Sequence, residues 1–415
     1  MEPARAWTAR AVCLLLGLVF TSEAAVRATE MPPGPDNAAL LYYQAYLLLP
    51  EPTMSQLEAR HEVLEGAPPD ETVRSYLERA GDALDLLAEG TQRTSCQWGI
   101  PYSHGYFVQA PHLLMIRELA FWLEAKARTL AADENHSSAL DQCVTLRRFA
   151  SHVADDVPIM YPVALAVDGV GLQAIQDILG RTPLEATIVS SLQRHFATLR
   201  GVPRSPARAV ETQLEVLWPM VAGDDETIAS MRESLARVSE GEGDSVVVDM
   251  EDREVMEIFR KPFEDFLDRA LPIMDSDRPY TETYPEIHGI VLTLEKELEA
   301  DPATLGLSVW ADNALNLYSV QVRHKARLRA MMAALEIYRI AAETKKLPDT
   351  LPSHAPLDPY SAEPFEYEIT ANGFLLRCQA GRIDGRVLVP GCWPEEEAED
   401  CPDEVIYEYR FEVTW

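Results

Sequence analysis

The spacing of apolar residues changes near Leu347, and this change constrains the fold more than any other feature of the sequence. Before that point apolar residues recur at three- and four-residue steps, which is typical of amphipathic helices. From residue 365 onward apolar and polar residues alternate, and Asn372-Gly373 supplies a turn, as expected of a β-hairpin. The last eleven residues alternate too, and 385–389 is a further strand candidate. The sequence therefore predicts a helical chain that ends in a small antiparallel sheet with one apolar face.

The helical part predicts an irregular bundle of helical hairpins. Helical patterning before residue 180 covers 37–49, 70–90, 113–132, 137–154 and 161–179. A long helix is expected at about 303–345, and we expect the β-unit to pack on it. The contacts expected there join Phe365 and Tyr367 to Leu328, Met332, Leu335 and Tyr338. The predicted fold is mainly α, with a small C-terminal antiparallel β-unit (α+β).

Four segments follow from these patterns. The stretch 239–247 is small, acidic and glycine-bearing, which favours a flexible boundary. The expected units are a signal peptide at 1–24, an N-terminal helical bundle at 30–240, a second helical region with the long helix at 249–346, and the β-unit at 347–415.

Two helix starts are marked by local signals. Asp36 is a suitable N-cap for the first helical segment. Thr182 and Glu185 have the spacing of a capping box, with Pro183 between them, so a helix is expected to begin at Pro183.

The N-terminus has the pattern of a secretory signal peptide. Arg5 and Arg10 precede an apolar run at 11–20, which is too short to span a membrane, and small residues follow. We expect cleavage after Ala24, which makes the protein exported, in the periplasm or cell envelope. Retention of the segment as an N-terminal anchor is the alternative.

The charge of the chain excludes two classes of partner. The formal net charge is −31 at pH 7. Such a surface repels nucleic-acid phosphates and anionic lipid headgroups. A protein partner in the envelope remains compatible with this composition.

The cysteines and glycines point to no cofactor. Five cysteines remain after residue 24, so at least one thiol is unpaired or bonds another chain; Cys392 and Cys401 are the candidate disulfide. No CxxC spacing is present, which disfavours a structural zinc site. The sequence also lacks a P-loop, a dinucleotide-binding glycine pattern and a GxSxG elbow. We therefore assign no metal, cofactor or catalytic residue.

An aromatic insert interrupts the helical pattern at 91–112. The candidate groove residues in it are Cys96, Trp98, His104, Tyr106 and His112. A thiol beside an imidazole could act as a nucleophile, and two histidines with a cysteine could bind a transition metal. The favoured interpretation is a loop that crosses the bundle and packs its aromatic side chains. A ligand-binding groove ranks second and catalysis third.

The C-terminal unit, over about residues 325–378, resembles the soluble part of type II secretion pseudopilins. The matching elements are Tyr338-Arg339, Leu347-Pro348, Asp358-Pro359-Tyr360 and Pro364-Phe365-Glu366-Tyr367. The resemblance implies a helix, a proline-containing loop and a hairpin. The prepilin leader of that family is not found in this sequence.

The chain is also similar to a group of uncharacterised exported helical bacterial proteins. The residues that carry this similarity are Cys96-Gln97-Trp98-Gly99, Pro111-His112-Leu113, Arg117, Leu119 and Ala120. This resemblance implies no known activity. The expected function is that of an exported non-enzymatic protein that acts through surface interactions. Alternatives are an accessory of a secretion or pilus-type apparatus and, less favoured, an enzyme with its site at 96–112.

Overall fold

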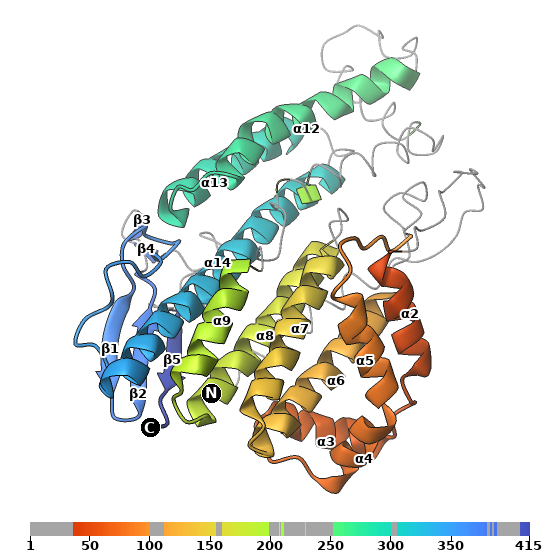
Figure 1. The fold of residues 1–415 in the computed structure, drawn as a ribbon. Helices are drawn as coiled ribbons and strands as arrows, with labels where there is room; N and C mark the ends of the chain where they lie inside the picture. Colours follow the sequence, from red (N-terminus) through yellow and green to blue (C-terminus); the bar gives the residue numbers. More distant parts are fainter. Residues whose placement is uncertain are drawn as a thin grey trace, which may run out of the picture.

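The fold is mainly helical with a small C-terminal sheet, as predicted (Figure 1). The computed structural model describes residues 36–99, 112–154, 160–198, 207, 209–210, 229, 252–299, 305–379, 382–383, 386–387 and 407–415. Eleven helices comprise 69% of these described residues. The predicted boundary at 239–247 and the candidate disulfide Cys392–Cys401 lie outside them.

Eight helices precede residue 200, and three follow residue 250, among the described residues. The first eight are α2 (Ala38–Leu48), α3 (Met54–Leu64), α4 (Glu71–Arg79), α5 (Gly81–Gly90), α6 (His112–Ala132), α7 (His136–Val153), α8 (Met160–Arg181) and α9 (Ala186–Thr198). The other three are α12 (Asp252–Met274), α13 (Tyr280–Glu299) and α14 (Leu305–Thr344). The long helix expected at 303–345 is therefore confirmed as α14.

Side-chain caps explain where the first helices begin. The Asn37 side chain accepts a hydrogen bond from the Ala39 amide at 3.2 Å, so Asn37, and not the predicted Asp36, is the N-cap of α2. Thr53 and Gln56 form a reciprocal capping box at the start of α3. The segment 70–90, expected as one helix, bends at Ala80 and forms α4 and α5.

The predicted helix start at Pro183 is wrong. Helix α9 begins at Ala186. The Thr182 hydroxyl donates to the Ile178 carbonyl at 2.7 Å, which extends the end of α8 instead of capping α9. The Leu184 amide donates to the Thr414 carbonyl at 2.9 Å, and Pro183 and Thr414 form an isolated parallel bridge, so this segment pairs with the C-terminal residues instead of joining α9.

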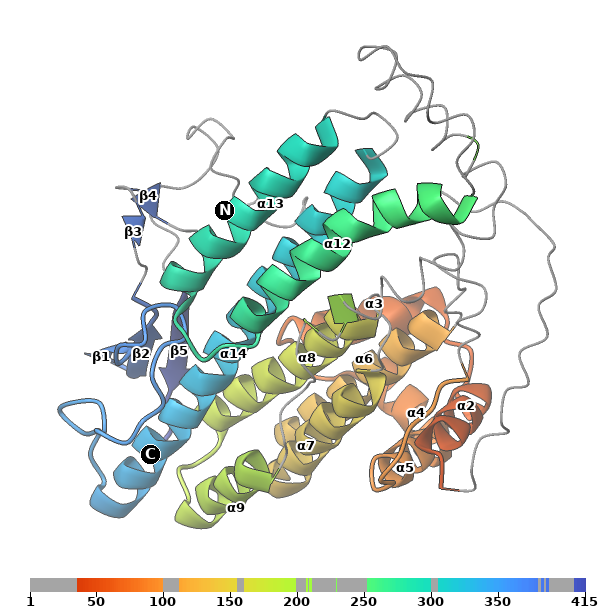
Figure 2. The ribbon, with the colours of Figure 1, turned by 90° about the horizontal axis from the view of Figure 1, so that it is seen from above.

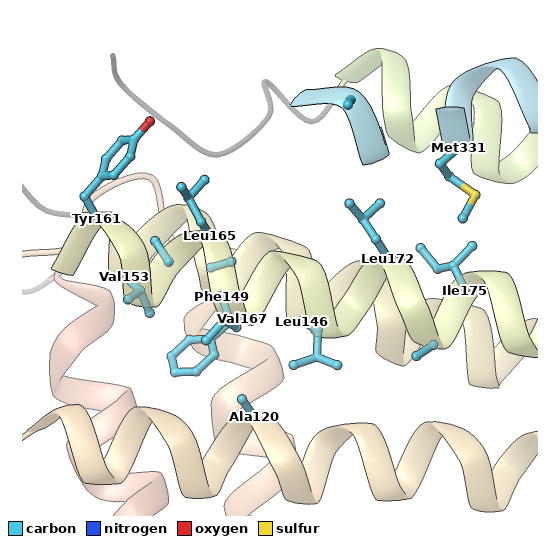
Figure 3. Packing of buried hydrophobic residues seen from close by; sticks show 14 of the residues in the cluster. Ala120, Leu146, Phe149, Val153, Tyr161, Leu165, Val167, Leu172, Ile175 and Met331 are labelled. Atoms are coloured by element: carbon cyan, nitrogen blue, oxygen red, sulfur yellow. The ribbon is translucent and has the colours of Figure 1, made fainter. Parts of the chain in front are cut away.

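The helices form a layered bundle built around α8. Helix α8 packs against α6, α7 and α14, and α14 also contacts α9 (Figures 1 and 2). Helices α2 and α5 pack together at the N-terminal side, and α12 and α13 lie on the side of α14 away from α7. Figure 3 shows the interior between these layers, where α6, α7, α8 and α14 contribute side chains such as Ala120, Phe149, Leu172 and Met331.

Helix α8 combines length with burial. By length and composition it is the helix of the described residues that could cross a membrane, but 61% of its apolar window is buried inside the protein. A core helix of a globular bundle has the same properties. Its position between α7 and α14 accounts for its composition.

The C-terminal sheet is antiparallel with the order β1-β2-β5. Its strands are β1 (Glu366–Thr370), β2 (Gly373–Arg377) and β5 (Glu408–Glu412). The hairpin closes with Thr370 opposite Gly373, so the turn is one residue earlier than the predicted Asn372-Gly373. Of the expected strand at 385–389, the structure describes Arg386–Val387, which form β4 and pair with β3 (Arg382–Ile383) outside this sheet.

One face of the sheet packs on α14. Phe374 stacks on Phe411 with ring centroids 5.1 Å apart, and Tyr338 of α14 meets Phe374 edge-on at 5.5 Å. Phe365 is buried in the same core, as expected, whereas Met332 is exposed and lies outside it. The packed sheet places the C-terminal strand beside both α14 and α8.

Candidate functional site

The described part of the aromatic insert packs between α2, α6 and α7. The Trp98 ring stacks on His112 at the start of α6, with centroids 5.0 Å apart and planes at 9°. It also stacks on Tyr42 of α2 at 5.6 Å. The Trp98 Nε1–H donates to the His152 carbonyl at the end of α7 at 2.8 Å. Trp98 thus joins three helices.

Asn37 holds this segment in place. Its Nδ2 donates to the Gln97 carbonyl at 2.7 Å, and its Oδ1 accepts from the Gln97 amide at 2.7 Å. The Ala38 amide donates to the Ser95 carbonyl at 2.9 Å. One buried amide side chain therefore caps α2 and pairs with the backbone of the insert.

Tyr42 and His152 form a polar contact within the aromatic cluster. The Tyr42 hydroxyl lies 2.6 Å from His152 Nδ1. Burial raises the pKa of Tyr42, and the nearby Cys96 thiol adds to this shift. Burial lowers the pKa of His152, while a hydrogen bond to the Arg93 backbone acts in the opposite direction. Both shifts favour the uncharged forms near neutral pH, so the contact joins a neutral phenol to a neutral imidazole.

Among the described residues, His112 has no hydrogen-bond partner for its buried Nε2 atom. The residue is 3% exposed, and burial lowers its pKa from 6.5 to about 4. A neutral imidazole stacked on an indole is an apolar contact, because the charged form would have to give up its hydration. His112 is thus suited to packing and poorly placed to carry a proton.

The structure brings Trp98 and His112 of the predicted groove together as a stack. Cys96 is half-buried and lies close enough to Tyr42 and Tyr43 to influence the pKa of both. His104 and Tyr106 lie outside the described residues. Sequence reasoning did not identify Tyr42 and His152, which come from other helices. Within the described ranges, no group of three or more His, Cys, Asp or Glu residues could hold a metal ion.

A second polar cluster is buried between α7, α8 and α14. Arg147 Nε donates to Asp168 Oδ1 at 2.8 Å, and His324 Nε2 lies 2.9 Å from Asp168 Oδ2. The Asp168 side chain is 0% exposed and that of Arg147 is 2% exposed. The Arg147 guanidinium also lies over the Phe196 ring of α9, 4.2 Å from its centroid. The cluster connects four helices.

Charge pairing keeps Asp168 ionised. Burial alone would raise its pKa, but the Arg147 guanidinium and the His324 ring outweigh burial and hold the pKa below its usual value. Sequence reasoning missed this cluster. A usable signal existed, because Asp168 is the single charged residue in 161–176 and a lone charge in an apolar helix needs a buried partner.

A neighbouring network continues this polar layer along α8. Arg128 Nη2 donates to Asp177 Oδ2 at 2.8 Å, and Arg128 Nε donates to Glu124 Oε1 at 2.9 Å. Arg327 of α14 donates to the Gln173 side chain. These contacts join α6 and α14 to α8.

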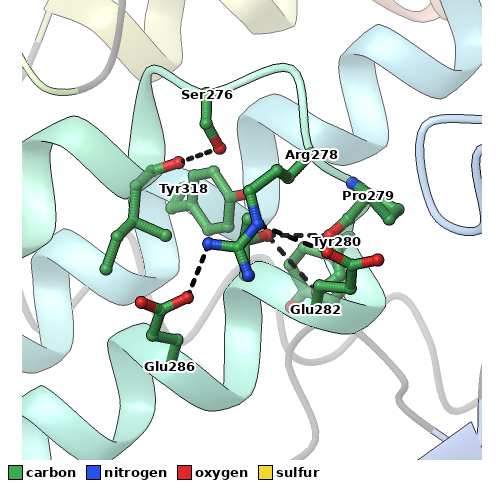
Figure 4. A network of polar contacts seen from close by, with 9 residues as sticks. Ser276, Arg278, Pro279, Tyr280, Glu282, Glu286 and Tyr318 are labelled. Atoms are coloured by element: carbon green, nitrogen blue, oxygen red, sulfur yellow. Dashed lines mark hydrogen bonds and ion pairs between the residues drawn. The ribbon is translucent and has the colours of Figure 1, made fainter.

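Tyrosines surround the junction between α13, α14 and the β-unit. The Tyr280 and Thr281 amides, at the start of α13, donate to the carbonyls of Pro359 and Tyr360 at 3.0 and 3.1 Å. The Tyr280 hydroxyl lies 3.0 Å from Ser319 Oγ of α14. Figure 4 shows this start of α13, where Arg278 pairs with Glu282 and Glu286.

Asp358 organises the loop of this junction. Its side chain is fully buried and accepts hydrogen bonds from the Tyr360 and Gln379 amides at 3.0 and 2.7 Å. Burial nevertheless raises its pKa above the usual value. Asp358 thus plays the turn-forming role that its position before Pro359 predicts.

The outer face of α2 differs from these buried clusters. Leu40, Leu47 and Leu48 are 39%, 81% and 56% exposed. The opposite face, with Tyr42 and Ala45, is buried in the core. Helix α2 lies at the periphery of the bundle in both views (Figures 1 and 2).

Comparison of the chain with protein-family models, with curated proteins and with solved structures gives no match.

Proposed function

We propose that this chain is an exported, non-enzymatic helical protein of the periplasm or cell envelope that acts through surface contacts. The exposed apolar face of α2 is the observation that carries the proposal. Leu40, Leu47 and Leu48 are 39%, 81% and 56% exposed on one helix, and a group of exposed apolar side chains, unlike a single one, indicates a contact surface. By contrast, Trp98 and His112, the most site-like residues of the insert, are each 3% exposed and pack on one another.

The signal-like segment at 1–24 supports export. The formal net charge of the chain, −31, favours partners whose surfaces are uncharged or basic. The buried charged groups support the non-enzymatic part of the proposal. Asp168 is fully used in contacts with Arg147 and His324, which leaves it no oxygen directed toward a substrate.

Cell fractionation with N-terminal sequencing tests export. We expect the protein in the envelope or periplasmic fraction, with an N-terminus after Ala24. Recovery in the cytoplasm with Met1 intact contradicts the proposal. A pull-down from the envelope fraction tests surface contact, with heat-denatured protein as the control bait. The absence of any envelope component above that background removes the interaction part.

A role as an accessory of a secretion or pilus-type apparatus is the second candidate. It is favoured by the order of elements, in which the 40-residue helix α14 leads through a proline-containing loop into the β1–β2 hairpin. Co-purification with an envelope-spanning assembly would favour this function, and a uniform distribution in the soluble periplasmic fraction would count against it.

A further inference from the structure

The triplet Asn135-His136-Ser137 is an acceptor sequence for N-linked glycosylation, because Ser follows Asn two residues later and the residue between them is not Pro. It occurs once in the sequence. The other asparagines have no Ser or Thr two residues later; they are Asn37, Asn313, Asn316 and Asn372. Modification of such a triplet requires export and exposure, so its place in the fold decides whether it can be used.

The triplet lies in the turn between α6 and α7. The four residues 132–135 are all exposed, and α7 begins at His136, directly after Asn135. Ser137, whose hydroxyl group the triplet requires, is also exposed, in the first turn of α7. Both the acceptor amide and the serine therefore lie on the surface of the bundle, where a bulky sugar displaces no core residue.

Backbone hydrogen bonds hold this turn without help from the Asn135 side chain. The Asn135 amide donates to the Leu130 carbonyl at 2.9 Å, and the Asn135 carbonyl accepts from the Ala139 amide at 3.0 Å. Glu134 has a φ of 61°, the left-handed conformation in which many helices end. Asn is common at an N-cap because its side chain caps the helix, but the Asn135 side chain makes no capping hydrogen bond to α7. The fold thus leaves this carboxamide available for modification.

We infer that Asn135 carries an N-linked oligosaccharide, which it receives in the compartment to which the chain is exported. The donor is an oligosaccharide whose anomeric carbon is bonded to a polyprenyl diphosphate, presented by a membrane-bound transferase. Asn135 Nδ2 forms a bond to the anomeric carbon and loses one proton to a base of the transferase. The bond between that carbon and the diphosphate oxygen breaks, and the polyprenyl diphosphate leaves with the electron pair. The inference rests on the export part of the proposed function and adds a covalent modification to it.

Mass spectrometry of the protein purified from its own envelope fraction tests the inference, and N-terminal sequencing of the same sample establishes export. Trypsin cleaves after Arg128 and Arg147, which releases the peptide 129–147 with Asn135 as its single asparagine. We expect this peptide to carry the additional mass of an oligosaccharide, and fragmentation should place that mass on Asn135.

Variants at neighbouring positions separate the triplet from its surroundings. Asn135→Gln and Ser137→Ala should each abolish the additional mass. Ser138→Ala is the matched control, because Ser138 is adjacent to the triplet in the same helical turn but outside it, and the mass should remain. Asn372→Gln, at an exposed turn whose sequence is not an acceptor, should also leave the peptide 129–147 modified. Since the Asn135 side chain caps no helix, Asn135→Gln should fold like the wild type, as measured by circular dichroism.

Three results overturn the inference. An exported protein with an unmodified peptide 129–147 does so and leaves the proposed function standing. An additional mass that persists in Asn135→Gln places the sugar on a serine or threonine, and loss of the mass in Ser138→Ala shows that the triplet is not what the transferase recognises. Recovery of the unmodified protein in the cytoplasm with Met1 intact contradicts the proposed function and the inference together.

Discussion

Replacing Asp168 with Asn tests the contribution of the Arg147–Asp168 ion pair, whose side chains are 2% and 0% exposed, to the stability of the described core. The change keeps the shape of the side chain but removes its charge, leaving the Arg147 guanidinium buried at 2% exposure without a counterion. Two hydrogen bonds lose their charge assistance, from Arg147 Nε at 2.8 Å and from Arg147 Nη2 at 3.4 Å. Hydrogen bonds to charged groups contribute about 1.5–3 kcal/mol each, and breaking a buried pair costs about 3–5 kcal/mol. We expect a loss of about 4 kcal/mol in unfolding free energy.

Urea denaturation monitored by circular dichroism and tryptophan fluorescence measures this loss. The double variant Arg147→Met/Asp168→Leu should be far less destabilised than Asp168→Asn, because neither charge is then left unpaired. Glu286→Gln is the control at an exposed pair, where Arg278 and Glu286 are 46% and 47% exposed and less than about 1 kcal/mol is expected. A cost below 1 kcal/mol for Asp168→Asn, or a double variant as unstable as the sum of the single variants, refutes the reasoning.

Three further predictions concern the packing around the site and the sheet. First, the pKa of His112 is about 6.5 in the unfolded chain and about 4 in the folded chain. The unfolding free energy should therefore be highest above pH 6.5 and fall by up to about 3 kcal/mol as the pH drops from 6.5 to 4, because the unfolded chain binds the proton more readily. His112→Phe should flatten this part of a plot of unfolding free energy against pH. Second, Gly90→Ala puts a Cβ 2.5 Å from Tyr42 Cε1, and a loss of about 1–3 kcal/mol in unfolding free energy should be measurable by urea titration; unchanged stability would show that α2 shifts freely on α5. Third, Gly373→Ala puts a Cβ 2.0 Å from the Phe411 carbonyl, so amides of β5 should lose hydrogen-exchange protection while those of α7 keep theirs.

Local patterns in the sequence were sufficient for the architecture. Helical periodicity gave α14 almost to its ends, and alternation gave the β1–β2 hairpin within one residue at its turn. Both patterns involve residues that are close in the sequence, so they can be recognised without knowledge of the three-dimensional contacts. Helix α3 was not predicted, because its sequence, MSQLEARHEVL, is mostly polar and places few residues in the core.

Contacts between distant segments set the limits of prediction. The Thr182-Pro183 signal is a valid local start, but the pairing of Leu184 with Thr414 overrides it. The insert shows the same limit. Its aromatic residues predicted packing across the bundle, whereas the Tyr42 and His152 partners come from helices whose sequences do not mark them as members of one cluster.

Helix α14 contacts both the helical bundle and the C-terminal sheet. Variants in α14 therefore affect the stability of the fold, whereas variants on an exposed face change the surface alone. The His324 side chain of α14 meets Asp168 of α8, and the Tyr338 hydroxyl of the same helix donates to the Glu412 carbonyl of β5. Substitutions along α14 therefore disturb the bundle and the sheet together, and a loss of binding in such variants would be uninformative. The exposed face of α2 has the opposite property. Leu47 contributes little to the core, so a variant at this position changes the surface while the buried contacts of Asn37 and Tyr42 continue to hold the helix.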